Sequence, residues 1–142
     1  MEKLMNVGDR LRQAGIPLTL QRLAIAQVLL PNPIHLTADQ ILARVKDVVP
    51  ETSRATVYNT LKLFREKGLV RELIVDAERT VFDSNTSPHF HLFDSDTGQV
   101  TDIPAEAMQV IGTPHLPEGV ELEEVDVIIR VHSRRPSAAP AA

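Results

Sequence analysis

The stretch Ser53–Asp83, with the sequence SRATVYNTLKLFREKGLVRELIVDAERTVFD, decides the fold predicted for this chain. Ser53 is a favourable N-cap for a helix, and Gly68 can adopt the left-handed conformation that often ends one. Residues 69–75 and 79–83 are rich in strand-forming side chains and are separated by a short turn. The stretch therefore predicts a helix followed by a β-hairpin.

The predicted helix has two different faces. Val57, Leu61 and Phe64 recur at helical spacing and should face the core. The opposite face carries Arg54, Tyr58, Lys62 and Arg65, with Asn59 beside Tyr58. A phenol and an amide can contact base edges while the cations reach phosphates, so this face suits DNA. A solvated amphipathic helix without DNA contact is the alternative.

Three further helices are predicted upstream. The first follows the apolar spacing of Leu4, Val7, Leu11 and Ala14. Thr19 can cap the second, and Thr37 with Gln40 forms a capping box for the third, with His35 in the loop just before it. Four helices followed by a hairpin make a winged helix-turn-helix, with the fourth helix in the major groove of DNA.

The charge distribution agrees with this assignment. The chain has 142 residues and a net charge of −4, but residues 1–75 carry a net +4 and residues 76–142 a net −8. A basic half attached to an acidic half indicates that the first half meets a polyanion such as DNA.

Some classes of protein are excluded by composition. The chain has no cysteine, which rules out disulfides, cysteine-ligated zinc and a thiol switch. No apolar stretch approaches membrane-spanning length, and the N-terminus lacks the pattern of a signal peptide. We expect a soluble cytoplasmic protein that does not bind membranes.

Five side chains are candidate metal ligands: His35, Asp83, His89, His91 and Asp102. Alternate residues of a strand point to the same side, so His89 and His91 can reach one ion. Mixed nitrogen and oxygen ligands favour iron(II), manganese(II) or zinc(II) over calcium or copper(I). Taken alone, the two histidines could equally be ordinary strand residues.

The acidic half is predicted to combine strands and one helix, giving the chain an α+β fold. Residues 89–93 and 99–102 are expected to be short strands, and Pro104 can begin a helix through about Ile111. Alternating Val125, Val127, Ile129 and Val131 predict a longer last strand. So small a sheet would gain from pairing with a second copy of the chain.

We therefore expect two domains and a tail. Residues 1–83 form a winged-helix DNA-binding domain, and residues 84–133 form a small α/β dimerisation and metal-sensing domain. Residues 134–142, rich in Pro, Ala and Ser, are expected to be disordered.

These motifs also resemble a known family, the ferric uptake regulator (Fur) family. The resemblance spans roughly residues 5–132 and is carried by SRATVYNTL (53–61), GLV (68–70), FD (82–83), HFH (89–91) and VTD (100–102). It implies a metal-dependent repressor that binds a palindromic operator as a homodimer. One regulatory ion per subunit, iron or manganese with zinc possible in vitro, would link the two domains and set the angle of the DNA-binding heads.

The resemblance also implies roles for individual residues. The regulatory ligands are His35, Asp83, His89, His91 and Asp102. The DNA-contacting residues are Thr19, Gln21, Arg22, Arg54, Thr56, Tyr58, Asn59, Lys62 and Arg65. In a peroxide-sensing member, His35 and His89 are the oxidation-sensitive ligands.

Two details favour the peroxide-sensing branch over the iron-sensing one. Asp102 and Asn59 stand where iron-sensing members tend to have glutamate and arginine. The family's Cys-x-x-Cys zinc site is absent, with Phe93 and Asp96 near its first cysteines, so packing must replace it. Residues 116–130 also look like the iron-response regulator (Irr) branch, which leaves iron or haem status as the alternative signal.

Two other functions stay open at this point. Histidines with a carboxylate also suit a small non-haem iron enzyme, although five protein ligands would leave few positions for substrate and oxygen. The third candidate function is that of a winged helix that binds other proteins instead of DNA. We expect a regulator rather than an enzyme.

Overall fold

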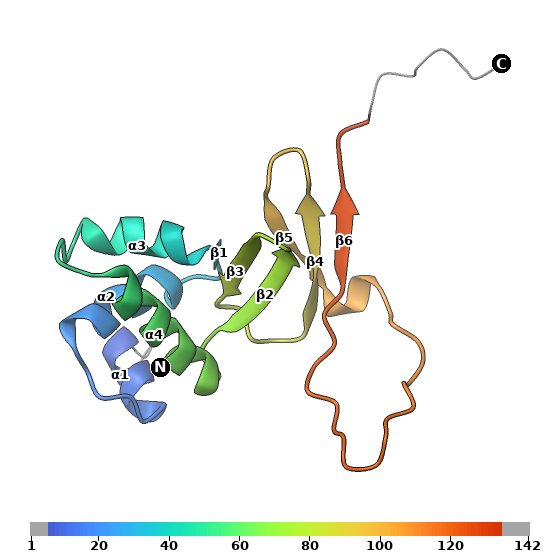
Figure 1. The fold of residues 1–142 in the computed structure, drawn as a ribbon, viewed down its shortest axis with the longest axis horizontal. Coiled ribbons are helices and arrows are strands. Elements are labelled where there is room, and N and C mark those ends of the chain that lie inside the picture. The colour runs from blue at the N-terminus through green and yellow to red at the C-terminus, as the bar shows by residue number, and fades with distance from the viewer. Residues whose placement is uncertain (1–5, 135–142) are drawn as a thin grey trace, which may run out of the picture. The chain divides into compact units, whose positions relative to one another are not determined.

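The computed structural model describes residues 6–134, and the chain divides into two compact units, Met1–Ser87 and Pro88–Ala142 (Figure 1). The first unit contains α1 (Val7–Gln13), α2 (Leu20–Leu29), β1 (His35–Leu36), α3 (Ala38–Lys46), α4 (Arg54–Glu66), β2 (Arg71–Asp76) and β3 (Arg79–Asp83). The second unit contains β4 (His89–Asp94), β5 (Val100–Pro104), the 3-10 helix η1 (Ala105–Ala107) and β6 (Ile128–Val131). Helices and sheets together confirm the predicted α+β class. Apart from Arg134, the predicted tail lies outside the described residues.

The helix ends follow the capping residues of the sequence. Thr19, Thr37 and Ser53 are the N-caps of α2, α3 and α4, and each hydroxyl accepts from a backbone N–H three residues ahead, at 3.1, 3.2 and 3.1 Å. The Gln40 side chain accepts from the Thr37 N–H at 2.9 Å, which completes the capping box. Gly68 follows α4 with φ of 74°, as predicted.

The core of the first unit lies between α2, α3 and α4. Val57, Leu61 and Phe64 are fully buried, which confirms the predicted inner face of α4. They pack in one cluster with apolar residues of the other helices, including Leu11, Ile25, Leu29, Ile41 and Val45. Burial of this face fixes α4 in place and leaves its opposite face in solvent.

A three-stranded antiparallel sheet of order β1-β3-β2 completes the first unit. The β2-β3 hairpin is the predicted wing. The prediction that His35 lies in a loop is wrong, because His35 and Leu36 pair with β3 as the short strand β1. This pairing joins residues almost fifty positions apart and leaves no local signal in the sequence.

The second unit is a three-stranded sheet of order β5-β4-β6, with β4 antiparallel to β5 and parallel to β6. The helix predicted from Pro104 to Ile111 is wrong, because only the short η1 forms. No side chain caps η1, and the β-branched Val110 and Ile111 followed by Gly112 favour extended chain. The last strand begins at Ile128 rather than near Val125.

Among the helices of residues 6–134, none has the length and apolar character that crossing a membrane requires.

The turn after β4 is tied to β6 by side-chain contacts. The Arg130 guanidinium lies 5.5 Å from the centre of the buried Phe93 ring. The Ser95 N–H and hydroxyl both donate to the Val131 carbonyl at 2.9 Å, and the Ser133 N–H donates to the Asp96 carboxylate at 2.9 Å. Packing and hydrogen bonds therefore join the strands where the resemblance suggested that zinc ligands are missing.

We predict that Arg130→Ala lowers the free energy of unfolding by about 1 kcal/mol, because it removes the cation and the aliphatic stem from the Phe93 ring. Urea denaturation followed by circular dichroism measures the change. Arg134→Ala, which removes the same charge from an exposed site beyond β6, should change stability little. Equal effects of the two substitutions would mean that the Phe93 contact does not stabilise the sheet.

Candidate metal centre and nucleic-acid interface

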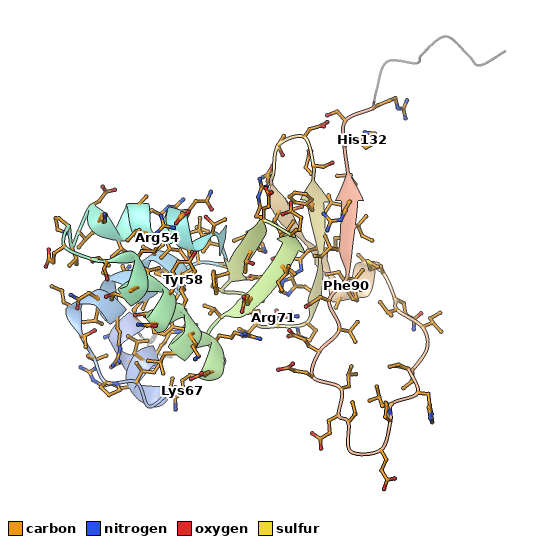
Figure 2. All side chains as sticks on the ribbon, in the orientation of Figure 1. Arg54, Tyr58, Lys67, Arg71, Phe90 and His132 are labelled. Carbon is orange, nitrogen blue, oxygen red and sulfur yellow. The ribbon has the colours of Figure 1, made fainter. Side chains whose placement is uncertain are left out.

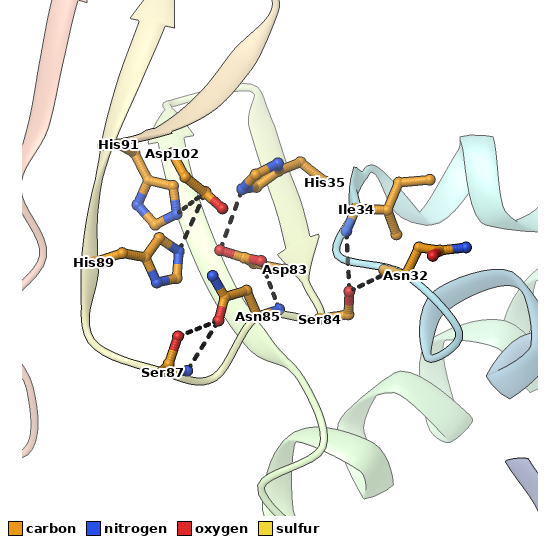
Figure 3. A network of polar contacts seen from close by, with 10 residues as sticks. All are labelled: Asn32, Ile34, His35, Asp83, Ser84, Asn85, Ser87, His89, His91 and Asp102. Atoms are coloured by element: carbon orange, nitrogen blue, oxygen red, sulfur yellow. Dashed lines mark hydrogen bonds and ion pairs between the residues drawn. The ribbon is translucent and has the colours of Figure 1, made fainter. Parts of the chain in front are cut away.

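His35 and Asp83 form a pair within the first unit. They are directly opposite each other on the antiparallel strands β1 and β3. His35 Nε2 lies 3.2 Å from Asp83 Oδ2, and the Asp83 side chain is fully buried (Figure 3). The Asn85 N–H donates to the second Asp83 oxygen, Oδ1, at 2.9 Å. These contacts fix the orientation of the carboxylate toward the imidazole.

Ser84 holds the two strands of this pair together, a role that the sequence did not indicate. Its hydroxyl accepts from the Ile34 N–H at 3.0 Å and donates to the Asn32 carbonyl at 3.1 Å (Figure 3). Its own N–H donates to the Ile34 carbonyl at 3.3 Å. The loop before β1 is therefore fastened to the end of β3, immediately beside His35 and Asp83.

His89, His91 and Asp102 form a second set, within the second unit. The two histidines lie on the same side of β4, as predicted, with their ring centres 4.5 Å apart. Asp102 on β5 is directly opposite His91. Asp102 Oδ1 lies 3.3 Å from His89 Nε2 and 3.7 Å from His91 Nε2 (Figure 3). One carboxylate oxygen thus faces both imidazoles.

The spacing within each set suits ligands of a divalent ion. Two ligands bound at about 2.1 Å with an angle of about 90–109° lie about 3.0–3.4 Å apart. The nitrogen-to-oxygen distances of 3.2, 3.3 and 3.7 Å are close to this range. Imidazole nitrogen with carboxylate oxygen is a donor set for iron(II), manganese(II) or zinc(II). All five residues can each offer one ligand atom, two from the first unit and three from the second.

The outer face of α4 carries the polar side chains expected of it. Arg54, Tyr58, Asn59, Lys62 and Arg65 are all exposed, and Tyr58 retains 48% of its surface. Figure 2 labels Arg54 and Tyr58 on this helix. A groove of about 540 Å³ runs along this face between the start of α3, α4 and the hairpin. Its lining includes Tyr58, Asn59, Lys62 and Arg65. A hydroxyl, an amide and two cations therefore line one concave surface.

The remaining residues predicted to contact DNA lie beside this face. A second, smaller groove of about 230 Å³ at the start of α2 is lined by Thr19, Gln21, Arg22, Thr56, Asn59, Thr60 and Leu63. Asn59 lines both grooves. The start of α2 and the face of α4 thus offer neighbouring polar surfaces, although the Arg22 guanidinium donates to the Pro17 carbonyl at 2.7 Å.

Two acidic residues that the sequence analysis did not single out also contact this face. Asp39, in the first turn of α3, lies 2.9 Å from the Arg54 guanidinium. Glu72, on β2, lies 2.8 Å from that of Arg65. The acidic partner of each pair comes from a neighbouring element, so helical spacing along α4 could not have identified it.

Comparison with known proteins supports the resemblance found in the sequence. The model of the ferric uptake regulator family matches residues 13–130. The peroxide-responsive repressor PerR of Staphylococcus aureus strain Mu50 is 40% identical over 92 residues, which cover 65% of this chain and 62% of that protein. The match therefore spans less than two thirds of that relative.

Solved structures share the fold. The ferric uptake regulator of Pseudomonas aeruginosa with manganese has a TM-score of 0.65 and 24% identity, covering 92% of this chain and 100% of that one. The ferric uptake regulator of Francisella tularensis with iron has a TM-score of 0.65 and 21% identity, and the match covers 83% of this chain and 92% of that one. Because the family model matches residues 13–130, which are most of this chain, the chain belongs to the ferric uptake regulator family.

Proposed function

We propose that this protein is a metal-dependent transcriptional regulator that binds operator DNA through α4, and that it is not an enzyme. The observation that carries the proposal is the presence of His and Asp donors at metal-ligand spacing in both units, His35 with Asp83 in one and His89, His91 and Asp102 in the other. Membership of the ferric uptake regulator family supports it.

The proposed mechanism is a coupling of metal binding to DNA binding. An ion that takes ligands from both units favours the arrangement of the units in which all five side chains can reach it. If that same arrangement fits the operator, metal and operator stabilise each other by their preference for one state. His35 and Asp83 are positioned by β1 and β3, which belong to the same unit as α4, so these two ligands would connect the ion to the DNA-binding helix.

We propose that the protein acts as a homodimer on a palindromic operator in the cytoplasm. The second unit leaves a set of large apolar side chains exposed, namely Val110, Ile111, Val120, Leu122, Val125 and Ile129. Exposed apolar surface of this extent is typical of an interface with a partner. A second copy of the chain would cover it and present two copies of α4 to two half-sites.

Iron(II) or manganese(II) is the proposed ion, and peroxide stress the proposed signal. The named relatives support both choices, since one is a peroxide-responsive repressor and two related folds were solved with manganese and with iron. Asp102 and Asn59 support the peroxide-sensing branch. The alternative signal is iron or haem status, as in the Irr branch.

A non-haem iron enzyme is the rival function, because His89, His91 and Asp102 alone match the two-histidine, one-carboxylate donor set of such enzymes. Two further protein ligands from the first unit would leave few coordination positions for substrate and oxygen. Members of the ferric uptake regulator family are transcription regulators, which favours the regulatory reading.

The proposal is tested by the metal dependence of operator binding. A fluorescent operator obtained by selection from random duplex DNA is titrated with the protein in manganese(II) and in chelator, and binding is followed by anisotropy. We expect affinity about 5–150-fold higher with manganese, the usual range of such couplings. Equal affinity under both conditions would refute metal control.

Tyr58 should contribute to sequence discrimination, because its exposed hydroxyl and ring line the groove along α4. We predict that Tyr58→Ala lowers the preference for operator over scrambled DNA by about 1–3 kcal/mol. Lys62→Ala is the matched comparison on the same face. It should weaken both DNAs alike and make the salt dependence shallower by roughly one unit. An unchanged preference in Tyr58→Ala would show that Tyr58 does not read a base.

A further inference from the structure

Of the two candidate ligands in the first unit, His35 lies on the more weakly held strand. β1 has two residues and lies at the edge of the sheet, whose order is β1-β3-β2. Asp83 lies on the central strand β3, where it is opposite both His35 of β1 and Arg71 of β2. A short strand with one neighbour opens at a lower cost in free energy than a central strand. The position of His35 therefore depends on what holds the end of β1.

Ser84 supplies the bonds at this end of β1. Ile34 and Ser84 follow the His35–Asp83 pair in the antiparallel register. The Ser84 N–H donates to the Ile34 carbonyl at 3.3 Å, whereas the Ile34 N–H donates to the Ser84 hydroxyl at 3.0 Å (Figure 3). The same hydroxyl donates to the Asn32 carbonyl at 3.1 Å, since a hydroxyl can accept and donate at once. One side chain thus extends the pairing of the two strands beyond His35.

His35 is held from both sides along the chain, but by different means. On one side, Leu36 is buried in the core cluster of the first unit. On the other side, Ile34 is only half-buried, and its backbone N–H is held by Ser84. Loss of the Ser84 hydroxyl would leave the end of β1 before His35 with weaker attachment to β3. Asp83 would keep its place through β2.

We propose that Ser84 is a positioning residue of the metal centre, which holds His35 where its imidazole can reach the ion. The inference rests on the proposed function, because it requires His35 to be a ligand. Without the Ser84 hydroxyl, the end of β1 is open in a larger fraction of the metal-free molecules. Binding must then close it again, so the apparent affinity falls with the fraction of molecules that are closed.

The test compares Ser84→Ala with Ser84→Thr, which keeps the hydroxyl, in the full chain. Manganese(II) affinity is measured by calorimetry without DNA. Opening of β1 is followed in the metal-free protein by hydrogen exchange of the Leu36 amide, because Leu36 pairs with Phe82. Ser84→Ala should exchange this amide faster and bind manganese about 2–13-fold more weakly, the net effect of one hydrogen bond. Ser84→Thr should restore both values.

Ser95→Ala is the matched control, because it removes a hydroxyl that donates to the Val131 carbonyl at 2.9 Å and so joins two segments of the second unit. It should leave manganese affinity unchanged. A second control adds Ser84→Ala to His35→Ala, where it should have no further effect if Ser84 acts through His35.

Unchanged manganese affinity in Ser84→Ala, equal losses in the two serine variants, or a loss that persists in the absence of His35 would overturn the inference. Each of these results leaves the proposed function intact. Full manganese affinity in His35→Ala would overturn both, because His35 would then not be a ligand.

Discussion

Asp102→Ala is expected to abolish the effect of manganese on operator binding. One Asp102 oxygen lies 3.3 Å from His89 and 3.7 Å from His91, so its removal takes away the anionic ligand that faces both imidazoles. Without it, the ion would lose its preference for one arrangement of the units. The 5–150-fold difference between manganese and chelator should shrink to about one, as measured by anisotropy with the labelled operator.

The Asp102 side chain is 30% exposed, so its replacement should leave the fold intact. Asp102→Asn keeps the shape and tests the charge alone, and it should also lose most of the metal effect. Glu106→Gln, an equal change of charge on the neighbouring η1, and His115→Ala, which removes an exposed histidine, should retain the full effect. A normal manganese response in folded Asp102→Ala would exclude Asp102 as a ligand.

Peroxide is expected to release DNA from the iron(II)-loaded protein but not from the manganese(II)-loaded protein. The chain has no cysteine, so a thiol switch is not available, and a ligand histidine is the remaining target tied to the metal. Iron(II) held by His35, Asp83, His89, His91 and Asp102 would activate peroxide by one-electron transfer next to the histidine rings. Overall, one peroxide oxygen is added to a ring and the other leaves as water, so the histidine is oxidised and the peroxide is reduced. One oxygen atom should be added to the peptide that contains His35 or His89, as mapped by mass spectrometry after digestion.

The matched manganese sample controls for general oxidation, because it carries the same ligands and receives the same micromolar peroxide. Its histidines should stay unmodified and its operator affinity unchanged. Methionine is another residue type that peroxide oxidises. Oxidation confined to Met1, Met5 or Met108, or release of DNA without a modified histidine, would favour the Irr-like reading over the peroxide-sensing one.

The sequence predicted those parts of the molecule that depend on near neighbours along the chain. Thr19, Thr37 and Ser53 cap their helices through bonds to residues three positions ahead, a spacing that is visible in the sequence. The buried face of α4 and the shared side of His89 and His91 follow from the periods of a helix and a strand. These regular patterns place individual side chains without knowledge of the tertiary fold.

The sequence could not predict contacts between distant segments. The bonds from Ser84 to Asn32 and Ile34 join positions about fifty residues apart, and they form beside the strand β1 that was expected to be a loop. The ion pairs of Asp39 and Glu72 with α4 have the same origin, because three elements must pack before those charges meet.

The error at residues 104–111 has a local cause. The prediction rested on Pro104, which is a favourable first residue of a helix. It gave too little weight to the β-branched Val110 and Ile111 and to Gly112, which disfavour a helix. The chain makes a single 3-10 turn at Ala105–Ala107, and the residues from Met108 to Val127 form neither helix nor strand. Residues 105–109 are good helix formers, but five residues before the β-branched pair and Gly112 are too few to sustain a helix that no side chain caps.

The central claim, that metal and operator select the same state of the protein, is tested most directly by the reciprocity of their binding. Manganese affinity is measured by calorimetry with and without saturating operator, and operator affinity by anisotropy with and without saturating manganese, in the same buffer. If the two are coupled, operator must raise manganese affinity by the same factor by which manganese raises operator affinity, a factor of about 5–150. A manganese affinity that does not change when operator is bound would contradict the account.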